Sequence, residues 1–220
     1  VISARSIERM EKVCKDIEKE FGVRCLPCKT DVSNRESVEN MVAFTLKEFG
    51  KVDILFNNAG VGAAGAALVK MTDEEFNKTI AIDVNGIYYC TTAVAREMIK
   101  RKIKGKIINV SSINYMMGID LDCDYGTAKG SVVAFTRQTA VELIKYGINV
   151  NCVCPGLFPT ELQPDFAEYV MKMAHRLIPA GHFGDNDDWK GIAVLLASSA
   201  GNYFVGSIII MDGGYAIGVV

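Results

Sequence analysis

The sequence lacks long apolar runs, an excess of positive charge and clusters of histidine. No run approaches the ~20 apolar residues of a membrane-spanning helix, so we expect no association with a membrane. Lys and Arg (24) are balanced by Asp and Glu (26), which argues against nucleic acid as a partner, because nucleic-acid-binding domains carry a basic patch. The two histidines, His175 and His182, accompany no cysteine cluster, so we expect no metal site.

The cysteines indicate a compartment rather than a site. There are seven of them, an odd number, and several lie in apolar segments of strand type, so a reducing, cytoplasmic location fits best. Cys25 and Cys28 form a C-x-x-C pair, which can mark metal or redox chemistry. Residues three apart on a strand point to opposite faces, and we therefore favour a structural interpretation of this pair.

Apolar segments of strand type alternate with segments of helical period along the whole chain. Strands are predicted at residues 1–3, 23–29, 52–56, 106–110, 148–154 and 207–211. Helices are predicted at residues 6–21, 33–49, 72–100, 125–146, 165–177 and 187–200, with capping boxes at Ser33/Glu36 and Thr72/Glu75. The alternation and the length of 220 residues predict one α/β domain with a doubly wound, mostly parallel sheet, in which the strand 52–56 is covered on both faces.

Three residues near the middle of the chain suggest proton-transfer chemistry. Ser112 closely follows the strand 106–110, and Tyr125 and Lys129 come later, four residues apart, which places these two side chains on one face of a helix. An ammonium beside a phenol lowers the pKa of the phenol from about 10 toward neutral pH, and a serine hydroxyl can hold a substrate oxygen. Taken alone, such a pair is more often a buried tyrosine and a surface lysine of an ordinary helix.

These residues belong to an ordered set of motifs. The chain contains NNAG at 57–60, DVNG at 83–86, Ser112, YGTAK at 125–129, CPG at 154–156 followed by Thr160, and MDGGY at 211–215. In this order and spacing the motifs resemble the short-chain dehydrogenase/reductase family over essentially the whole chain. The resemblance implies a Rossmann-like fold and an NAD(P)-dependent oxidoreductase that moves hydride between a nicotinamide cofactor and a secondary alcohol or ketone.

The resemblance also implies a role for individual residues. Tyr125 is the general acid/base, and Lys129 assists it and binds the nicotinamide ribose. Ser112 positions the substrate oxygen, and Asn85 holds a water that completes a proton relay. Asn85 and the glycine after it are poor helix formers, so we expect a local kink there. Further cofactor contacts are implied for Arg5, Asp31, Val32, Asn58, Ala59, Gly60, Pro155, Gly156, Phe158 and Thr160.

The phosphate-binding segment of the family is not found in the sequence. The family's TGxxxGxG loop is absent, so the resemblance implies a natural protein that is longer by roughly 30 residues, including a central strand. Residues 60–65 match GxGxxG, but the next helix signal begins only at Thr72 and its first turn is acidic, so we do not interpret them as a phosphate loop. Arg5 stands where NAD-binding members carry an acidic residue, which favours NADP(H) over NAD(H).

Two segments are expected to determine the substrate, residues 113–124 and a substrate loop at 157–184. Asp120, Asp122 and Asp124 form either a solvated loop or an acidic lip that disfavours anionic substrates. A sugar, polyol or sugar acid is the favoured substrate, and a 3-oxoacyl-acyl-carrier-protein or a hydroxysteroid is the alternative. A non-catalytic binding or scaffold protein is the alternative of another class. The resemblance further implies a homodimer or homotetramer, formed through the two long helices and the last strand.

Overall fold

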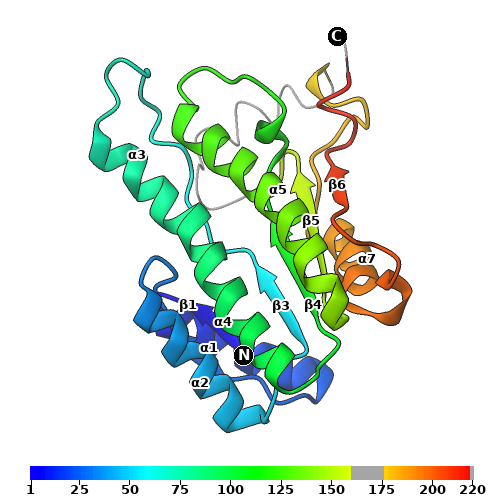
Figure 1. Cartoon of the computed structure of the whole chain (residues 1–220). Coiled ribbons are helices and arrows are strands. Elements are labelled where there is room, and N and C mark those ends of the chain that lie inside the picture. Colours follow the sequence, from blue (N-terminus) through cyan, green and yellow to red (C-terminus); the bar gives the residue numbers. More distant parts are fainter. Residues whose placement is uncertain (160–175, 219–220) are drawn as a thin grey trace.

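A computed structural model describes residues 1–159 and 176–218, in which strands and helices alternate (Figure 1). The strands are β1 (Ile2–Ala4), β2 (Pro27–Lys29), β3 (Ile54–Asn57), β4 (Lys106–Val110), β5 (Asn149–Pro155) and β6 (Ile208–Met211). The α-helices are α1 (Ile7–Phe21), α2 (Arg35–Phe49), α3 (Asp73–Ile80), α4 (Gly86–Lys100), α5 (Cys123–Leu143) and α7 (Asn186–Ala197). Short helices are the π-helix η1 (Ala81–Asn85) and the 3-10 helices η2 (Ile113–Tyr115), η3 (Ile144–Tyr146) and η4 (Ser199–Gly201).

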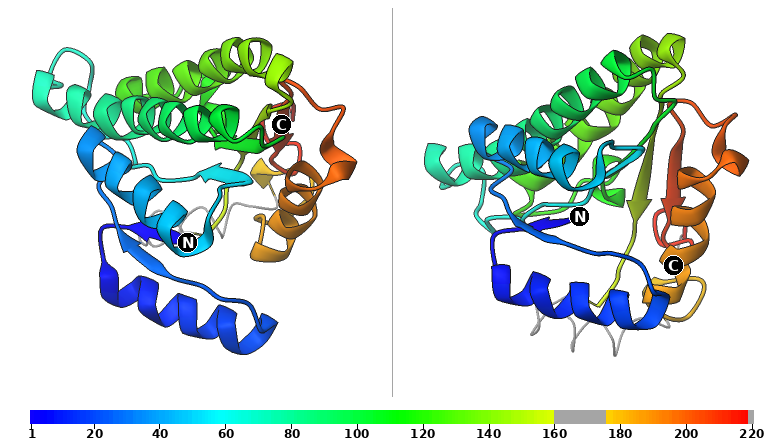
Figure 2. Two further views of the ribbon diagram at one scale, coloured as in Figure 1. Left: turned by 60° about the horizontal axis from the view of Figure 1, so that its bottom comes forward. Right: turned by 90° about the horizontal axis from the view of Figure 1, so that it is seen from below.

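All strand pairs in the described part of the chain are parallel, and helices lie on both sides of the strands. β1 pairs with β2, and a second sheet has the order β3-β4-β5-β6. Figure 2 shows α4 and α5 on one side of the strands and α1 and α7 on the other. This arrangement confirms the predicted doubly wound α/β fold.

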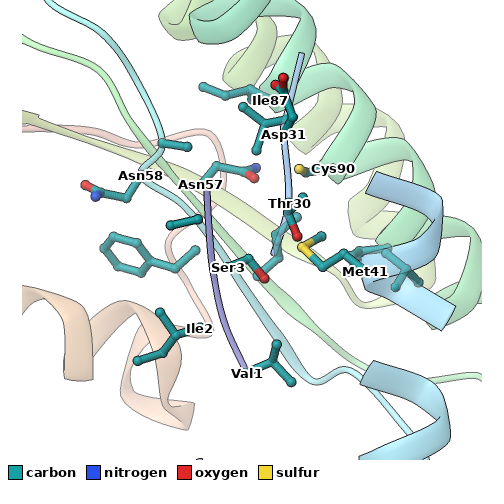
Figure 3. A pocket seen from close by; sticks show the side chains of 18 of the residues that line it. Val1, Ile2, Ser3, Thr30, Asp31, Met41, Asn57, Asn58, Ile87 and Cys90 are labelled. Carbon is teal, nitrogen blue, oxygen red and sulfur yellow. The ribbon is translucent and has the colours of Figure 1, made fainter. Parts of the chain in front are cut away.

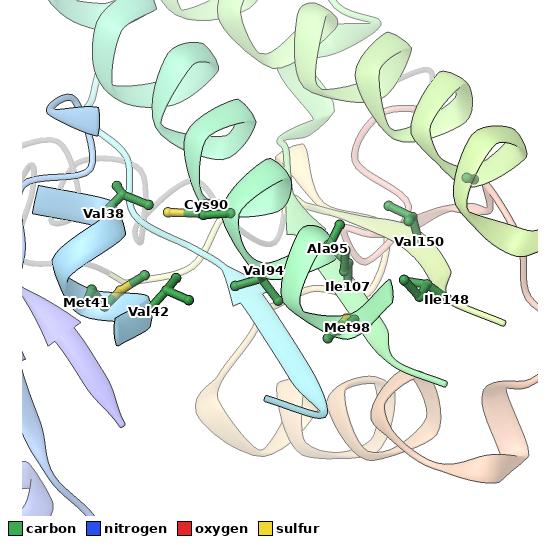
Figure 4. Close-up of a cluster of buried hydrophobic side chains, with 12 residues drawn as sticks. Val38, Met41, Val42, Cys90, Val94, Ala95, Met98, Ile107, Ile148 and Val150 are labelled. Atoms are coloured by element: carbon green, nitrogen blue, oxygen red, sulfur yellow. The ribbon is translucent and has the colours of Figure 1, made fainter. Parts of the chain in front are cut away.

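The main core lies between the second sheet and the helices α2 and α4 (Figure 4). All five residues of β4 are buried, and so are the first six residues of β5. The strand β4 is apolar over most of its length because helices cover both of its faces, as is usual in parallel sheets. On the other side, Leu196 of α7 packs against Ile108 and Val153.

The strand β3 was predicted to be covered on both faces by helices, and the structure differs. Ile54 and Phe56 are 47% and 40% exposed, so the expectation of a strand covered on both sides is wrong for β3. The reason is the arrangement of the two sheets: β1 and β3 do not pair with each other, and their facing edges line a pocket of about 670 Å³. Several of the site residues described below line this pocket.

Several predicted element boundaries are corrected by the structure. The strand predicted at 23–29 is formed only by Pro27–Lys29, because its partner β1 offers three residues for pairing. The capping box predicted at Ser33 is wrong: Asn34 caps α2 by accepting a hydrogen bond from the Ser37 amide. The capping box of Thr72 and Glu75 is confirmed.

The remaining helices follow the prediction with shifted ends. The helix predicted at 125–146 begins two residues earlier, at Cys123, and ends as the 3-10 turn η3. The helix predicted at 187–200 spans Asn186–Ala197, and Ser198, in extended backbone conformation, separates it from η4. The helix predicted at 165–177 lies, except for its last two residues, outside the described residues.

Candidate active site

The carboxyl ends of β3, β4 and β5 meet at one edge of the sheet, where open α/β folds usually bind ligands. The NNAG segment extends from β3 beyond this edge, and Ser111 and Ser112 follow β4. The helix α5 packs against β4, β5 and η2. The topology therefore brings the sequence motifs together although they are far apart in the chain.

Tyr125 and Lys129 lie one turn apart in α5, as predicted from their spacing. The Lys129 Nζ lies 5.2 Å from the centroid of the Tyr125 ring. Lys129 is buried, and its backbone carbonyl accepts a hydrogen bond from Ser111 Oγ at 2.8 Å. The end of β4 and the middle of α5 are thus joined directly, which fixes the lysine relative to the neighbouring serines.

Ser112 is buried and its hydroxyl is hydrogen-bonded to Asn114, a residue that the sequence did not single out. Ser112 Oγ donates to Asn114 Oδ1 at 3.2 Å and accepts from the Asn114 amide at 3.3 Å. The Asn114 side chain in turn donates to Asp122 Oδ2. Burial raises the pKa of Asp122. The predicted substrate-positioning hydroxyl of Ser112 is therefore the first member of a polar chain that continues through Asn114 to Asp122.

Asp83 is the nearest charged partner of Lys129 that the structure describes. Its Oδ2 lies 2.8 Å from Lys129 Nζ, and its Oδ1 accepts a hydrogen bond from the Val61 amide at 2.9 Å. In the sequence, Asp83 appears only as the first residue of the DVNG motif, and no role was expected for it. No helix begins within Gly60–Gly65, since α3 starts at Asp73, in line with the prediction that this segment is not a phosphate loop.

The helical segment around Asn85 is irregular, as its composition suggested. Residues Ala81–Asn85 form the π-helix η1, and the Gly86 amide donates to the Ala81 carbonyl. A side chain at Gly86 would place its Cβ 2.8 Å from Val32 Cγ2, so glycine allows α4 to approach the loop after β2. π-Helical turns of this kind occur often at functional sites.

Six of the residues predicted to contact the cofactor line the 670 Å³ pocket between β1 and β3 (Figure 3). They are Arg5, Asp31, Val32, Asn58, Ala59 and Gly60. Hydrogen bonds from the Ser33 hydroxyl and amide lower the pKa of Asp31, and Arg5 contributes to the same shift. The NNAG turn adds small residues that let a ligand approach the backbone. These polar and small residues suit a nucleotide, whereas most of the remaining lining is apolar.

Pro155, Gly156 and Phe158 are not part of this pocket. Phe158 lines a second pocket, of about 420 Å³, together with His182 and Asp212. A Cβ at Gly156 would lie 2.6 Å from Asp212 Cβ, so the turn after β5 packs tightly against the turn after β6. Thr160 and most of the predicted substrate loop lie outside the described residues.

Neither interpretation of the three aspartates before Tyr125 holds for all of them. Asp124 is fully buried, and its Oδ2 accepts hydrogen bonds from Thr79 Oγ1 at 2.7 Å and the Ala64 amide at 3.1 Å. Asp122 is half-buried and bonded to Asn114, and only Asp120 is exposed. The expectation of a solvated loop or a continuous acidic lip is therefore wrong, because Asp124 bonds to Thr79 and the Ala64 amide and Asp122 bonds to Asn114.

A buried network of amides and hydroxyls lies beneath the site, and it was not predicted from the sequence. The Asn57 side chain donates to Thr91 Oγ1 at 3.0 Å and to Asn109 Oδ1 at 2.9 Å. Asn109, fully buried in β4, donates to Thr136 Oγ1 at 2.9 Å. The network joins β3, α4, β4 and α5. An asparagine within an apolar strand could have served as the signal.

The predicted structural role of the C-x-x-C pair is supported by where its cysteines lie. Cys25 is buried with its Sγ 3.3 Å from Cys14 Sγ, and burial raises the pKa of Cys14 to about 11. Cys28 lies beside Thr30 instead. Within residues 1–159 and 176–218 no group of three or more His, Cys, Asp or Glu side chains is placed to hold a metal ion. None of the helices in these ranges is long and apolar enough to cross a membrane.

A parallel sheet with a Ser, Tyr and Lys set beyond its carboxyl edge is the arrangement of an α/β oxidoreductase. A family model described as enoyl-(acyl carrier protein) reductase matches residues 1–216. The chain belongs to the short-chain dehydrogenase/reductase family. It is an oxidoreductase that uses a nicotinamide cofactor to interconvert alcohols and ketones.

Named relatives act on several substrates. The chain is 35% identical over 196 residues to a (2S)-[(R)-hydroxy(phenyl)methyl]succinyl-CoA dehydrogenase subunit of Thauera aromatica, covering 89% of this chain and 78% of that protein. It is 30% identical over 222 residues to 5-keto-D-gluconate 5-reductase of Escherichia coli, covering 100% and 86%. The structure of a gluconate 5-dehydrogenase from Burkholderia cenocepacia in complex with NADP and tartrate matches with a TM-score of 0.92 at 29% identity, covering 99% of this chain and 85% of that one.

Proposed function

We propose that this enzyme reduces the ketone of a sugar acid, sugar or polyol, or oxidises the corresponding alcohol, with Tyr125 as the general acid/base. Bound NADP(H) supplies or accepts the hydride at its nicotinamide. In alcohol oxidation the Tyr125 phenolate takes the hydroxyl proton, and in ketone reduction the phenol returns it to the oxygen. The observation that carries this assignment is the position of Tyr125 and Lys129 on one face of α5 beside Ser111.

The neighbouring residues take the remaining roles. Lys129 stabilises the phenolate by its charge and contacts the nicotinamide ribose, and Ser112 donates a hydrogen bond to the substrate oxygen. Asn85, at the end of the π-helix, holds the relay water that connects Lys129 to solvent. Pro155 and the residues after it support the nicotinamide from the end of β5. The gathering of Ser112, Tyr125 and Lys129 beyond the carboxyl edge of the sheet favours an enzyme over the scaffold alternative.

The preference for a polyhydroxylated substrate rests on Asn114. Its side chain is hydrogen-bonded to Ser112 Oγ at 3.2 Å, so an amide group lies next to the hydroxyl that is proposed to hold the reacting oxygen. A substrate with a hydroxyl beside its ketone can bond to both groups, whereas a plain ketone can use only the Ser112 hydroxyl. The relative that reduces 5-keto-D-gluconate has this substrate pattern. A 3-oxoacyl thioester is the second candidate, favoured by the description of the family model.

A substrate panel tests the proposal. The purified enzyme is incubated with NADPH and, in turn, a keto sugar acid, a neutral ketose, a plain methyl ketone and a 3-oxoacyl thioester, and the loss of reduced nicotinamide is followed by absorbance. We expect the keto sugar acid and the ketose to be turned over fastest. Asn114→Ala should lower kcat/KM for these two about tenfold, the value of one hydrogen bond, and leave the methyl ketone within twofold. Fastest turnover of the thioester would replace the sugar assignment.

NADP(H) is proposed as the cofactor because Arg5 is the cation at the rim of the pocket and no carboxylate accompanies it on β1. A guanidinium binds a 2′-phosphate, whereas a carboxylate would repel it. The reducing, cytoplasmic location expected from the cysteines is part of the same proposal.

A homodimer or homotetramer is proposed as the assembly, with α4 and α5 at the contact. Val141 of α5 is 74% exposed in the single chain, which suits burial against a second copy. Val141→Glu should lower the mass measured by light scattering at micromolar concentration. Val13→Glu, on α1, is the matched control and should leave it unchanged. A wild-type monomer would contradict the proposal.

A further inference from the structure

Asp83 is fully buried and forms an ion pair with the ammonium of Lys129. The two charged atoms, Asp83 Oδ2 and Lys129 Nζ, are 2.8 Å apart, and the side chains are 0% and 6% exposed. In the described part of the chain Oδ2 has no hydrogen bond, so its interaction with Lys129 is one of charge. A buried charge is stable only when it is paired, and each group therefore fixes the position of the other.

The surroundings of the pair leave it little freedom. Asp83 Oδ1 accepts a hydrogen bond from the Val61 amide. A Cβ at Gly60 would lie 3.0 Å from Asp83 Oδ2 and 3.3 Å from Lys129 Nζ, so the backbone of the NNAG turn closes the pair from one side. Asp83 itself lies in the π-helix η1, whose extra residue per turn changes the direction of its side chains. The pair joins the turn after β3, η1 and α5.

We propose that Asp83 is a positioning residue that holds the Lys129 ammonium beside Gly60 and thereby sets the field that Lys129 exerts on Tyr125. The ammonium lies 5.2 Å from the centre of the Tyr125 ring. A negative charge 2.8 Å from the ammonium changes that field strongly, because the site is buried. The inference rests on the roles proposed for Tyr125 and Lys129.

Other titratable groups also face Lys129. Tyr125 lies on the same helix, and β5 contributes the thiols of Cys152 and Cys154, which are buried with their sulfur atoms 3.9 Å apart. Contact with Cys152 and burial raise the pKa of Cys154. Both cysteines are kept in every variant below, so their contribution cancels from each comparison.

The first test measures unfolding of the full chain by urea without cofactor or substrate, so it does not depend on the proposed substrate. The variants are Asp83→Asn, Lys129→Met and the double variant. Removing one partner leaves a buried unpaired charge, whereas removing both does not. We expect the double variant to unfold at a higher urea midpoint than Asp83→Asn or Lys129→Met alone. Additive losses would overturn the proposal.

Asp124 provides a matched control for this cycle. It too is a fully buried carboxylate that accepts a hydrogen bond from the same loop, at the Ala64 amide. The losses of Asp124→Asn and Lys129→Met should add. Equal coupling in both cycles would overturn the assignment of Asp83. If Asp83→Asn gives no soluble protein, recovery of soluble protein in the double variant supports the pair, and no recovery overturns it.

The second test separates positioning from a merely structural role. Asp83→Asn keeps an acceptor for the Val61 amide but removes the charge. The pH at which alcohol oxidation reaches half its maximal rate should move by about one unit or more. It should move down, because the Lys129 ammonium then acts on the Tyr125 phenol without the opposing charge of Asp83. An upward shift would overturn the proposal. A lower rate with an unmoved pH profile would make Asp83 structural and overturn the proposal.

Discussion

The two parts of the candidate site, catalytic and cofactor-binding, differ in how far buried contacts fix them. On the catalytic side, β4 and β5 are almost entirely buried and buried polar groups join them to α4 and α5. On the cofactor side, β1 and β2 have three residues each and their polar contacts are largely exposed. The groups proposed to act on the substrate are held by buried contacts within the protein, whereas the groups proposed to bind the nucleotide remain accessible from solvent.

The same contrast appears between the buried network of Asn57 and Asn109 and the hydrogen bonds of Asp31. Asn57 and Asn109 connect four elements through buried hydrogen bonds, each of which would cost free energy if left unpaired. Asp31 bonds to Ser33 in the loop after β2 and to Ser37 in the first turn of α2. Long-range buried contacts hold the first network rigid, and the second depends on local turn geometry.

The strongest test of the comparison acts on the catalytic side. Tyr125→Phe removes only the hydroxyl that transfers the proton, so kcat should fall by ~10³-fold or more while the thermal unfolding temperature stays close to that of the wild type. Steady-state kinetics with NADPH and a calorimetric scan check the two parts. Tyr146→Phe, at the exposed end of α5, is the control and should keep full activity. Turnover near the wild-type rate in Tyr125→Phe would exclude the mechanism.

The second prediction concerns stability on the same side. Asn109→Leu leaves buried partners without hydrogen bonds, at about 1–3 kcal/mol for each unsatisfied group, so the free energy of unfolding should fall by about 2–4 kcal/mol. Ser37→Ala removes the acceptor of the Asp31 amide on the exposed cofactor side and should cost about 1 kcal/mol or less. Urea unfolding measures both. Equal losses would show that the two sides are fixed to the same degree.

The third prediction acts on the cofactor side alone. Arg5→Ala should lower kcat/KM for NADPH by about 10- to 100-fold, the value of one charge-assisted hydrogen bond, and leave kcat/KM for NADH nearly unchanged. Lys12→Ala, which removes an exposed positive charge from α1, is the control. A parallel fall with both cofactors would give Arg5 a structural role and leave the preference for NADP(H) unsupported.

Local patterns in the sequence predicted most of the fold and the central site residues. The spacing of Tyr125 and Lys129 predicted that both side chains lie on one face of a helix, because this depends on the backbone period alone. The apolar run 52–56 predicted cover on both faces, which is wrong for β3. Element ends were less predictable. Ser33 and Asn34 are both good helix caps, and only the turn built by Asp31 and Ser33 leaves Asn34 in the capping position.

Contacts between distant segments could not be predicted from local patterns. Asp83 and Lys129 meet because η1 and α5 pack together, and no spacing in the sequence relates the two. Asp124 seemed to belong to an exposed acidic run, but Thr79 of α3 and the Ala64 amide cover it. The exposure of Ile54 in β3 likewise depends on which strands pair, a property of the whole sheet.

The smallest predicted effect comes from glycines on the two sides of Lys129. Gly130 lies inside α5, and a Cβ there would have no heavy atom within 4 Å, whereas a Cβ at Gly60 would press against Asp83 and Lys129. Glycine within a helix costs roughly 0.5–1 kcal/mol relative to alanine, so Gly130→Ala should raise the free energy of unfolding by about that amount, and Gly60→Ala should lower it. Urea unfolding measures both changes. Destabilisation by Gly130→Ala would contradict the open space beside α5 in the single chain and would mean that a second copy packs against this helix.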